Sequence, residues 1–178
     1  MLKNIKINLD AIEAMNYFWH AASDKDHIEE SFFFNLVEMP AMEYLYEDEF
    51  GAEQVRLVLS AIKNRELVNG NKKVKKFWNY NMWVMEDLEY TRSMINPCKK
   101  LNLDDIVEEL KEKDSKSKYE SLEVIFTIMY DGVYEIRDNK LLINLFRVKP
   151  SDFDDKTYID GVEMKEFIKD KLIEVLNQ

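Results

Sequence analysis

The residues best suited to chemistry lie in a stretch rich in aromatic and amide side chains near the middle of the chain. If this stretch is helical, Asn79, Trp83, Glu86 and Tyr90 share one face, and Asn81 lies within the neighbouring apolar face. Amphipathic aromatic rings and amides can line a small-ligand pocket, and a buried Glu86 could transfer protons. The spacing therefore predicts a candidate pocket formed by Asn79, Asn81, Trp83, Glu86 and Tyr90.

A structural interpretation of the same stretch is simpler, and we favour it. Aromatic and methionine side chains at helical spacing usually form a core, so Trp78 and Trp83 would be buried anchors. Burying the amide of Asn81 costs about 1–3 kcal/mol unless it is hydrogen-bonded. A backbone carbonyl or a neighbouring helix could supply that hydrogen bond.

A second candidate site combines acidic and aromatic residues between Glu43 and Glu53, where the second expected helix ends and the third begins. Interfaces are enriched in aromatic side chains, and acidic rims speed association with basic partners. The alternative is a solvated helix end. The candidate protein-binding residues are Glu43, Tyr44, Tyr46, Glu47, Asp48, Glu49, Phe50 and Glu53.

Sequence signatures of common enzymes and cofactor sites are missing. The chain has no glycine-rich dinucleotide or phosphate loop, no GxSxG and no HExxH motif. His20 and His27 are the two histidines, and their spacing does not suit a metal pair on one helix. The single cysteine, Cys98, excludes an intramolecular disulfide and lacks the neighbours of a nucleophile. The sequence predicts no catalytic residues, no metal and no cofactor.

The charge balance limits the classes of partner. The 178-residue chain carries a net charge of −10, which disfavours nucleic acid and anionic membranes and favours basic proteins. Solubility alone could also explain this charge. The run Lys72, Lys73, Lys75 and Lys76 is too small a footprint for nucleic acid, and it can complement the end of the preceding helix.

Nothing in the sequence resembles a targeting or membrane-spanning segment. The N-terminal residues Met1 to Asp10 mix Lys3, Lys6 and Asp10 with apolar residues, unlike a signal-peptide core. The uncharged stretch Val124 to Tyr130 is far shorter than the roughly 20 apolar residues that a transmembrane helix needs. A cytoplasmic location is expected.

Helical periodicity dominates the first two thirds of the chain. Apolar residues recur every three or four positions, and caps, Pro or Gly divide them into about five helices. Pro40 should divide the second helical stretch, and Asn96-Pro97 should end the fourth. Asn102 should cap the fifth. The expected segments are 10–22, 27–48, 52–68, 73–95 and 103–110, with an exposed linker at 111–118.

The pattern changes to strand alternation after the linker. Leu122, Val124, Phe126 and Ile128 alternate with other residues, and Asp131-Gly132 has the composition of a two-residue hairpin turn. Strands at 133–137 and 141–148 would complete an antiparallel meander, followed by an amphipathic helix that begins near Asp160.

The expected fold is therefore α+β and mainly α: an N-terminal helical bundle, a three-stranded antiparallel meander and a C-terminal helix. Residues 1–113 form the helical region, and residues 119–178 form the meander and last helix. We expect the two to pack as one domain.

The leading functional hypothesis is a non-catalytic, acidic protein-binding module, such as an inhibitor, an antidote or an immunity-type protein. The alternative is a small-ligand-binding protein or an enzyme with its pocket against the fourth helix. The aromatic content, 3 Trp, 9 Tyr and 10 Phe, also permits a homo-oligomer interface.

Overall fold

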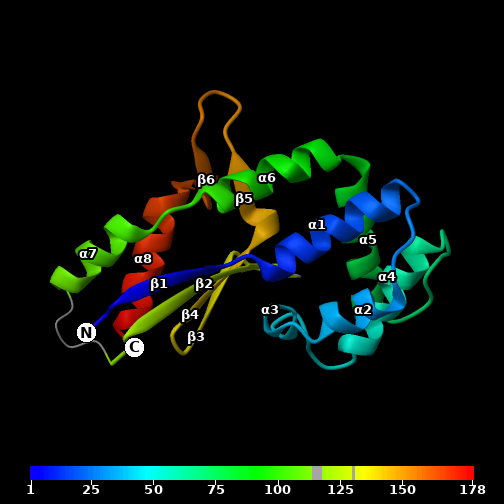
Figure 1. Ribbon diagram of the computed structural model, residues 1–178, viewed down its shortest axis with the longest axis horizontal. Helices are drawn as coiled ribbons and strands as arrows, with labels where there is room; N and C mark the ends of the chain where they lie inside the picture. Colours follow the sequence, from blue (N-terminus) through cyan, green and yellow to red (C-terminus); the bar gives the residue numbers. More distant parts are fainter. Residues whose placement is uncertain (114–117, 130) are drawn as a thin grey trace. The chain divides into compact units, whose positions relative to one another are not determined.

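The computed structural model describes residues 1–113, 118–129 and 131–178. It is an α+β protein, as the sequence predicted, and it contains two sheets where one was expected (Figure 1). Two compact units share the chain. The helical unit contains residues 10–92 and 128–129, and the sheet unit contains residues 1–9, 93–113, 118–127 and 131–178. This division differs from the expected 1–113 and 119–178, because the sheet unit also takes segments from the first half of the chain.

The helical unit is built around buried aromatic rings. Phe18 packs edge-on against Phe33 with ring centroids 6.0 Å apart, and Phe50 packs against Phe77 at 5.4 Å. These four rings are almost completely buried and come from three helices and a loop. The helices are α1 (Asp10–Ser23), α2 (Glu30–Val37), α3 (Pro40–Glu43), α4 (Ala52–Lys63), α5 (Lys72–Glu86) and the first part of α6 (Leu88–Lys100).

Local chemistry explains where these helices differ from expectation. Pro40 does begin a separate helix, as predicted. The expected single helix over 73–95 is instead two, because Asp87 leaves the helical conformation and its Oδ1 accepts a hydrogen bond from Tyr90 N at 2.9 Å. The predicted stop at Asn96-Pro97 was wrong, since α6 continues through Pro97 to Lys100. Burial of Met94, Ile95 and Cys98 stabilises this last turn.

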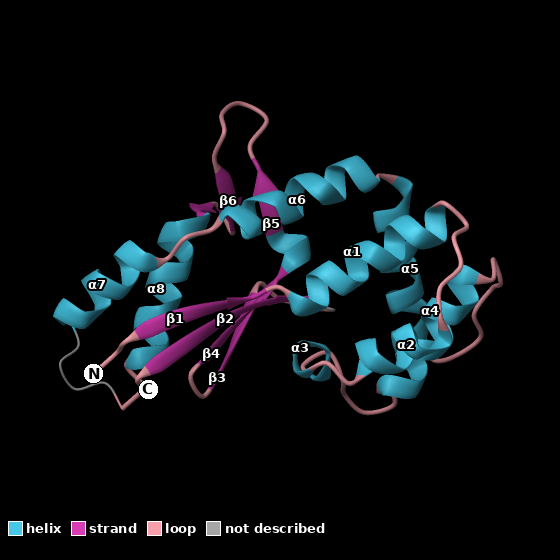
Figure 2. Cartoon of the chain, in the orientation of Figure 1, coloured by secondary structure: helices cyan, strands magenta, loops and turns pink. Residues whose placement is uncertain are grey.

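The sheet unit contains a mixed four-stranded sheet and a small three-stranded one (Figure 2). The first comprises β1 (Asn4–Asn8), β2 (Ser121–Thr127), β3 (Tyr134–Arg137) and β4 (Lys140–Asn144). The second comprises β5 (Val148–Pro150), β6 (Thr157–Ile159) and β7 (Val162–Glu163), and it follows the short 3-10 helix Leu145–Arg147. The helices of this unit are the second part of α6, α7 (Asp104–Lys113) and α8 (Met164–Leu176).

The predicted antiparallel meander was wrong. The strand order is β1-β2-β4-β3, with β2 parallel to both β1 and β4, and only β3 and β4 form an antiparallel hairpin. The reason lies in β2, where Ile125 is buried together with Val124 and Phe126. A strand buried on both faces is typical of the interior of a parallel arrangement. The Asp131-Gly132 turn therefore leads away from β2 instead of closing a hairpin with it.

The last helix begins at Met164, later than the predicted start near Asp160, because Asp160 lies in the turn between two short strands. Asp160 and Gly161 have φ values of +52° and +77° and form the turn between β6 and β7. The cap of α8 is Glu163, whose side chain accepts a hydrogen bond from Glu166 N at 3.2 Å. α8 contacts β4, β6 and β7, and the ring of Phe167 packs on Tyr134.

Two remaining expectations concern single segments. Asn102 lies one residue before the N-cap position of α7, which is Leu103, and its Oδ1 accepts a hydrogen bond from the first helical N–H, that of Asp104, at 2.9 Å. The predicted linker at 111–118 includes residues 114–117, which lie outside the described residues, whereas α7 extends to Lys113. Within the described ranges, no helix combines the length and the apolar composition needed to cross a membrane.

Candidate functional site

The predicted protein-binding residues form one continuous surface segment, residues 43–53, which we call the acidic segment. At its centre Glu47 and Phe50 exchange two backbone hydrogen bonds of 2.9 Å, which close a tight turn with Asp48 and Glu49 at its tip. Glu49 adopts a positive φ of +65°. The two reciprocal hydrogen bonds fix the backbone of this turn.

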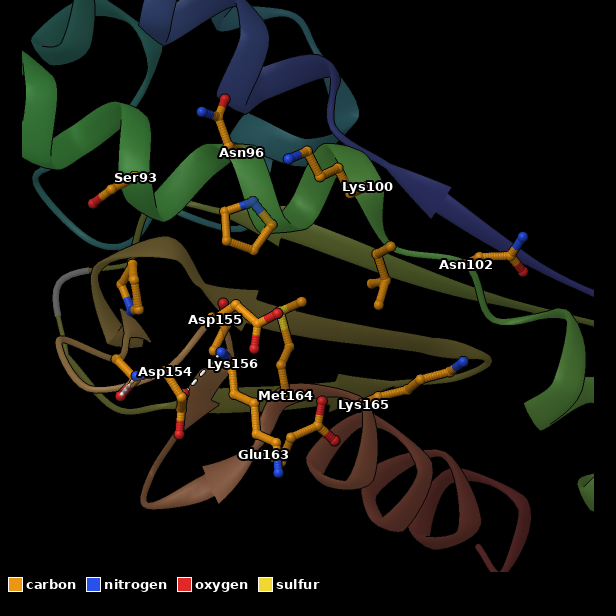
Figure 3. Close-up of a pocket in the computed structure, with 15 residues that line it drawn as sticks. Ser93, Asn96, Lys100, Asn102, Asp154, Asp155, Lys156, Glu163, Met164 and Lys165 are labelled. Atoms are coloured by element: carbon orange, nitrogen blue, oxygen red, sulfur yellow. Dashed lines mark hydrogen bonds between the residues drawn. The ribbon is translucent and has the colours of Figure 1, made fainter.

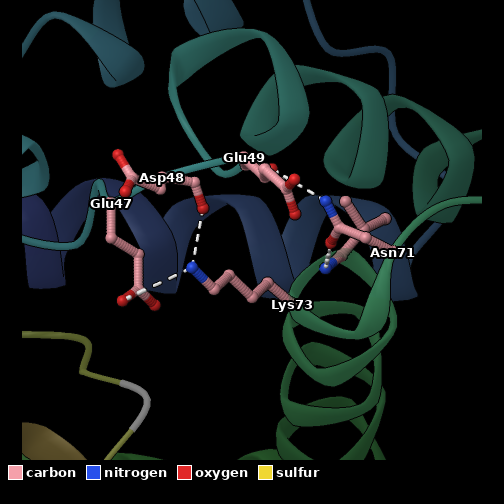
Figure 4. A network of polar contacts seen from close by, with 6 residues as sticks. Glu47, Asp48, Glu49, Asn71 and Lys73 are labelled. Atoms are coloured by element: carbon pink, nitrogen blue, oxygen red, sulfur yellow. Dashed lines mark hydrogen bonds and ion pairs between the residues drawn. The ribbon is translucent and has the colours of Figure 1, made fainter.

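The start of α5 clamps this turn from the side, as Figure 4 shows. The ammonium group of Lys73 donates to the carbonyl of Asp48 at 2.6 Å and lies 3.7 Å from the carboxylate of Glu47. The amide of Asn71 donates to the carbonyl of Glu49 at 2.9 Å while its Oδ1 caps α5 at Val74 N. Within the predicted lysine run, Lys73 thus serves the acidic segment.

Two aromatic members of the segment, Tyr46 and Phe50, face inward, whereas Tyr44 is half-buried. Phe50 is 1% exposed and packs on Phe77, so its assignment to a binding surface was wrong. The hydroxyl of Tyr46 donates to Val37 O at 2.5 Å. Burial, with a smaller contribution from nearby Glu43, raises the pKa of Tyr46 to about 12. The apolar core uses these rings because burying them stabilises the fold more than leaving them at the surface.

The carboxylates remain at the surface. Glu43, Glu47, Asp48, Glu49 and Glu53 are all exposed, and only Glu47 forms an ion pair within the described part of the chain. The acidic segment therefore presents negative charge on a backbone that is already ordered.

The predicted pocket residues do not converge. Asn81 is 2% exposed, and its Oδ1 accepts a 2.8 Å hydrogen bond from the indole of Trp19 in α1. Its amide donates to Phe77 O, also at 2.8 Å. Asn81 therefore joins two helices in the core, as the structural interpretation proposed, and its amide is not available to a ligand.

The other four predicted pocket residues lie at the surface. Trp83 is half-exposed and its ring contacts Tyr90 edge-on at 6.3 Å, so these two do come together. Glu86 is exposed. Asn79 lines a different hollow of about 220 Å³, together with Leu67, Val68, Lys75 and Trp78. Of the five predicted pocket residues, only Asn79 lines this hollow against α5. The hollow is smaller than typical ligand pockets.

The sheet unit contains a larger cleft, of about 640 Å³, which the sequence did not predict. Figure 3 shows its walls. Ser93, Asn96 and Lys100 come from α6, and the loop between β5 and β6 contributes Asp154, Asp155 and Lys156. Glu163 at the end of β7 and Met164 and Lys165 at the start of α8 complete the lining. The aspartate-rich loop was visible in the sequence. Its proximity to α6 depends on the tertiary structure, and no short motif could have revealed it.

Several charged groups at this cleft already have partners. Lys165 lies 2.7 Å from Asp105, and hydrogen bonding by Lys165 lowers the pKa of that carboxyl. Asp154 accepts a hydrogen bond from Lys156 N at 2.8 Å, and Glu163 caps α8. The cleft therefore carries polar groups of both signs, and part of that charge serves the local fold.

Metal binding and thiol chemistry receive no geometric support. Among the described residues, no cluster of three or more His, Cys, Asp or Glu side chains could hold a metal ion. Cys98 is 1% exposed, and burial raises the pKa of its thiol to about 12. A buried thiol of this kind is a poor nucleophile.

Comparisons with protein-family models, with curated proteins and with solved structures found no match to this chain.

Proposed function

We propose that this protein is a non-catalytic binding module that recognises a basic protein through its acidic segment. An inhibitor, an antidote and an immunity-type protein are examples of such a module. The observation that carries the proposal is the combination of exposed carboxylates with an ordered turn. The Lys73 and Asn71 hydrogen bonds hold the backbone carbonyls of Asp48 and Glu49 in place, so little backbone entropy is lost on binding.

The electrostatics favour the same class of partner. The net charge of −10 attracts a basic protein at long range, and the carboxylates at the tip would act at close range. Salt should weaken the complex, because interactions between exposed charges are screened within about 8–10 Å at physiological ionic strength. The inward orientation of Phe50 and Tyr46 makes charge, not aromatic contact, the main source of recognition.

The test begins with tagged full-length protein recovered from a lysate of its source cells, with native mass spectrometry to identify the bound protein. The dissociation constant of the purified complex is then measured for the double variant Asp48→Lys, Glu53→Lys. We expect it to rise at least about tenfold, since a few close charge pairs supply the required ~1.4 kcal/mol. Glu47 is left unchanged because it pairs with Lys73.

The matched control is the double variant Glu112→Lys, Asp170→Lys, which makes the same charge change at two exposed positions outside the segment. The control should change the dissociation constant much less. Equal effects of the two variants would show that net charge alone drives binding. The assignment to the acidic segment would then be wrong.

A small-ligand-binding protein is the second candidate, and the cleft of the sheet unit favours it. Its volume of about 640 Å³ lies within the range of ligand sites, although its charged walls differ from the mainly apolar lining of most of them. A panel of polar metabolites should then raise the unfolding temperature of the full chain. An Asp155→Asn variant should reduce that rise if the cleft is the site.

A further inference from the structure

Two helices of the helical unit end in the same unusual way. After α1, Lys25 has a φ of +59°, and after α4, Arg65 also has a φ of +59°. In both turns a backbone N–H reaches back five residues: Asp26 N donates to Ala21 O and Glu66 N donates to Ala61 O, each at 2.8 Å. This is the Schellman arrangement, in which the residue with positive φ is usually glycine.

Side-chain hydrogen bonds join these two helix ends. Arg65 donates to Ala22 O at 2.9 Å, and Lys63 donates to Ile28 O at 3.0 Å. Between them lies a hollow of about 470 Å³, which we call the basic hollow. Its lining includes the side chains of Lys25, His27, Lys63 and Arg65 together with the carboxylate of Asp26. His27 is paired with the carboxylate of Glu29 at 3.3 Å, so the cations that face the hollow are Lys25, Lys63 and Arg65.

The positive charge of this cluster is opposite in sign to the net charge of the protein, which is −10. Part of it is structural, because Arg65 binds the carbonyl of Ala22 at the C-terminal end of α1, and Lys63 binds the carbonyl of Ile28 in the loop that follows α1. Lys25 is different: its side chain is exposed and has no hydrogen bond or ion pair to any other described residue. A non-glycine residue at this φ is strained, so the fold itself would favour glycine at position 25.

We propose that the basic hollow binds the phosphate group of a small phosphorylated molecule. Arginine and lysine donate charge-assisted hydrogen bonds to phosphate oxygens, and both Lys63 and Arg65 keep further N–H groups beyond those bound to carbonyls. Lys25 adds a third cation from the opposite helix end. The backbone hydrogen bonds of the two turns cover terminal carbonyls that would otherwise repel an anion.

The test uses the full-length protein and thermal unfolding in inorganic phosphate, with chloride at matched ionic strength as the reference. A mononucleotide is a second probe, and whichever binds more tightly distinguishes free phosphate from an organic phosphate. We expect a saturable rise in unfolding temperature with phosphate. In Lys25→Gly the unfolding temperature without phosphate should rise because backbone strain is relieved, while the phosphate dissociation constant should increase roughly tenfold.

The matched control is Asp138→Gly, which relieves a similar positive φ of +53° in the sheet unit. It should also raise the unfolding temperature but leave the phosphate dissociation constant unchanged. The proposal is overturned if phosphate stabilises the protein no more than chloride does. It is equally overturned if Lys25→Gly binds phosphate as tightly as the unaltered protein.

Discussion

At the scale of single residues, α1 and α5 carry both satisfied and unsatisfied buried polar groups. Trp19 and Asn81 complete each other's hydrogen bonding across the two helices. One turn earlier in each helix, Asn16 Oδ1 and Trp78 Nε1 are buried without a hydrogen-bond partner in the described part of the chain. Because a buried, unpaired polar atom costs free energy, the Trp19–Asn81 pair is the stabilising polar contact here.

Replacing Asn81 with leucine should therefore destabilise the protein. The change leaves the buried indole N–H of Trp19 without an acceptor, and we expect the free energy of unfolding to fall by about 2 kcal/mol. Urea denaturation followed by circular dichroism measures this. Asn79→Leu, at an exposed position on the same helix, should change stability by no more than about 0.5 kcal/mol. A more stable Asn81→Leu variant would instead indicate that this amide is kept for function.

The sequence predicted the type of partner for Asn81 but not its identity. Periodicity places the amide on an apolar face, where a buried polar group must be hydrogen-bonded. Which helix supplies the donor depends on packing between residues 62 positions apart. The same limit applies to Phe50, because a single aromatic residue among acids can face either side of a turn.

At the scale of elements, the turns determine where several helices and strands end. Lys25 and Arg65 end α1 and α4, and Asp160-Gly161 reverses the chain between β6 and β7. Each of these positions has a positive φ. Glycine adopts this conformation easily, whereas other residues need support from the surrounding hydrogen bonds.

Replacing Gly161 with alanine measures the free-energy cost of a positive φ in a residue other than glycine. A methyl group at Gly161 would contact nothing within 4 Å, so the effect should come from its φ of +77° alone. We expect a loss of about 1 kcal/mol in the free energy of unfolding, measured by thermal or urea denaturation. Gly51→Ala is the control: its φ is −129° and its added methyl meets only Gln54 Oε1, at 3.7 Å. A larger loss at Gly51 than at Gly161 would contradict the strain argument.

At the scale of the whole molecule, the sheet unit is assembled from separated parts of the chain. β1 lies at the N-terminus but pairs with β2, in the register Asn4↔Ser121 to Asn8↔Ile125. The helices α7 and α8 are joined by ion pairs from Lys165 to Asp105 and from Lys169 to Glu109. The helical unit is instead almost continuous in sequence.

This difference predicts how fragments behave. A fragment of residues 119–178 lacks β1, α6 and α7. Their loss exposes one edge of β2 and removes the α7 carboxylates that pair with Lys165 and Lys169 of α8, so the fragment should not fold alone. A fragment of residues 10–92 keeps the aromatic core of the helical unit and should retain its helices. Circular dichroism and amide NMR dispersion measure both outcomes. A well-dispersed spectrum from residues 119–178 would restore the domain boundary expected from the sequence.

The sequence by itself determined the fold class, most helix positions and the exposed acidic charge. These follow from local periodicity, capping chemistry and composition, which act over a few residues. Tertiary structure alone decided that β2 and β4 pair in parallel, that β1 completes their sheet and that Phe50 turns inward. It also brought the ends of α1 and α4 together around the basic hollow. Burial and hydrogen bonding between distant segments determine which strands pair and which helices are in contact. Local sequence patterns do not predict these long-range interactions.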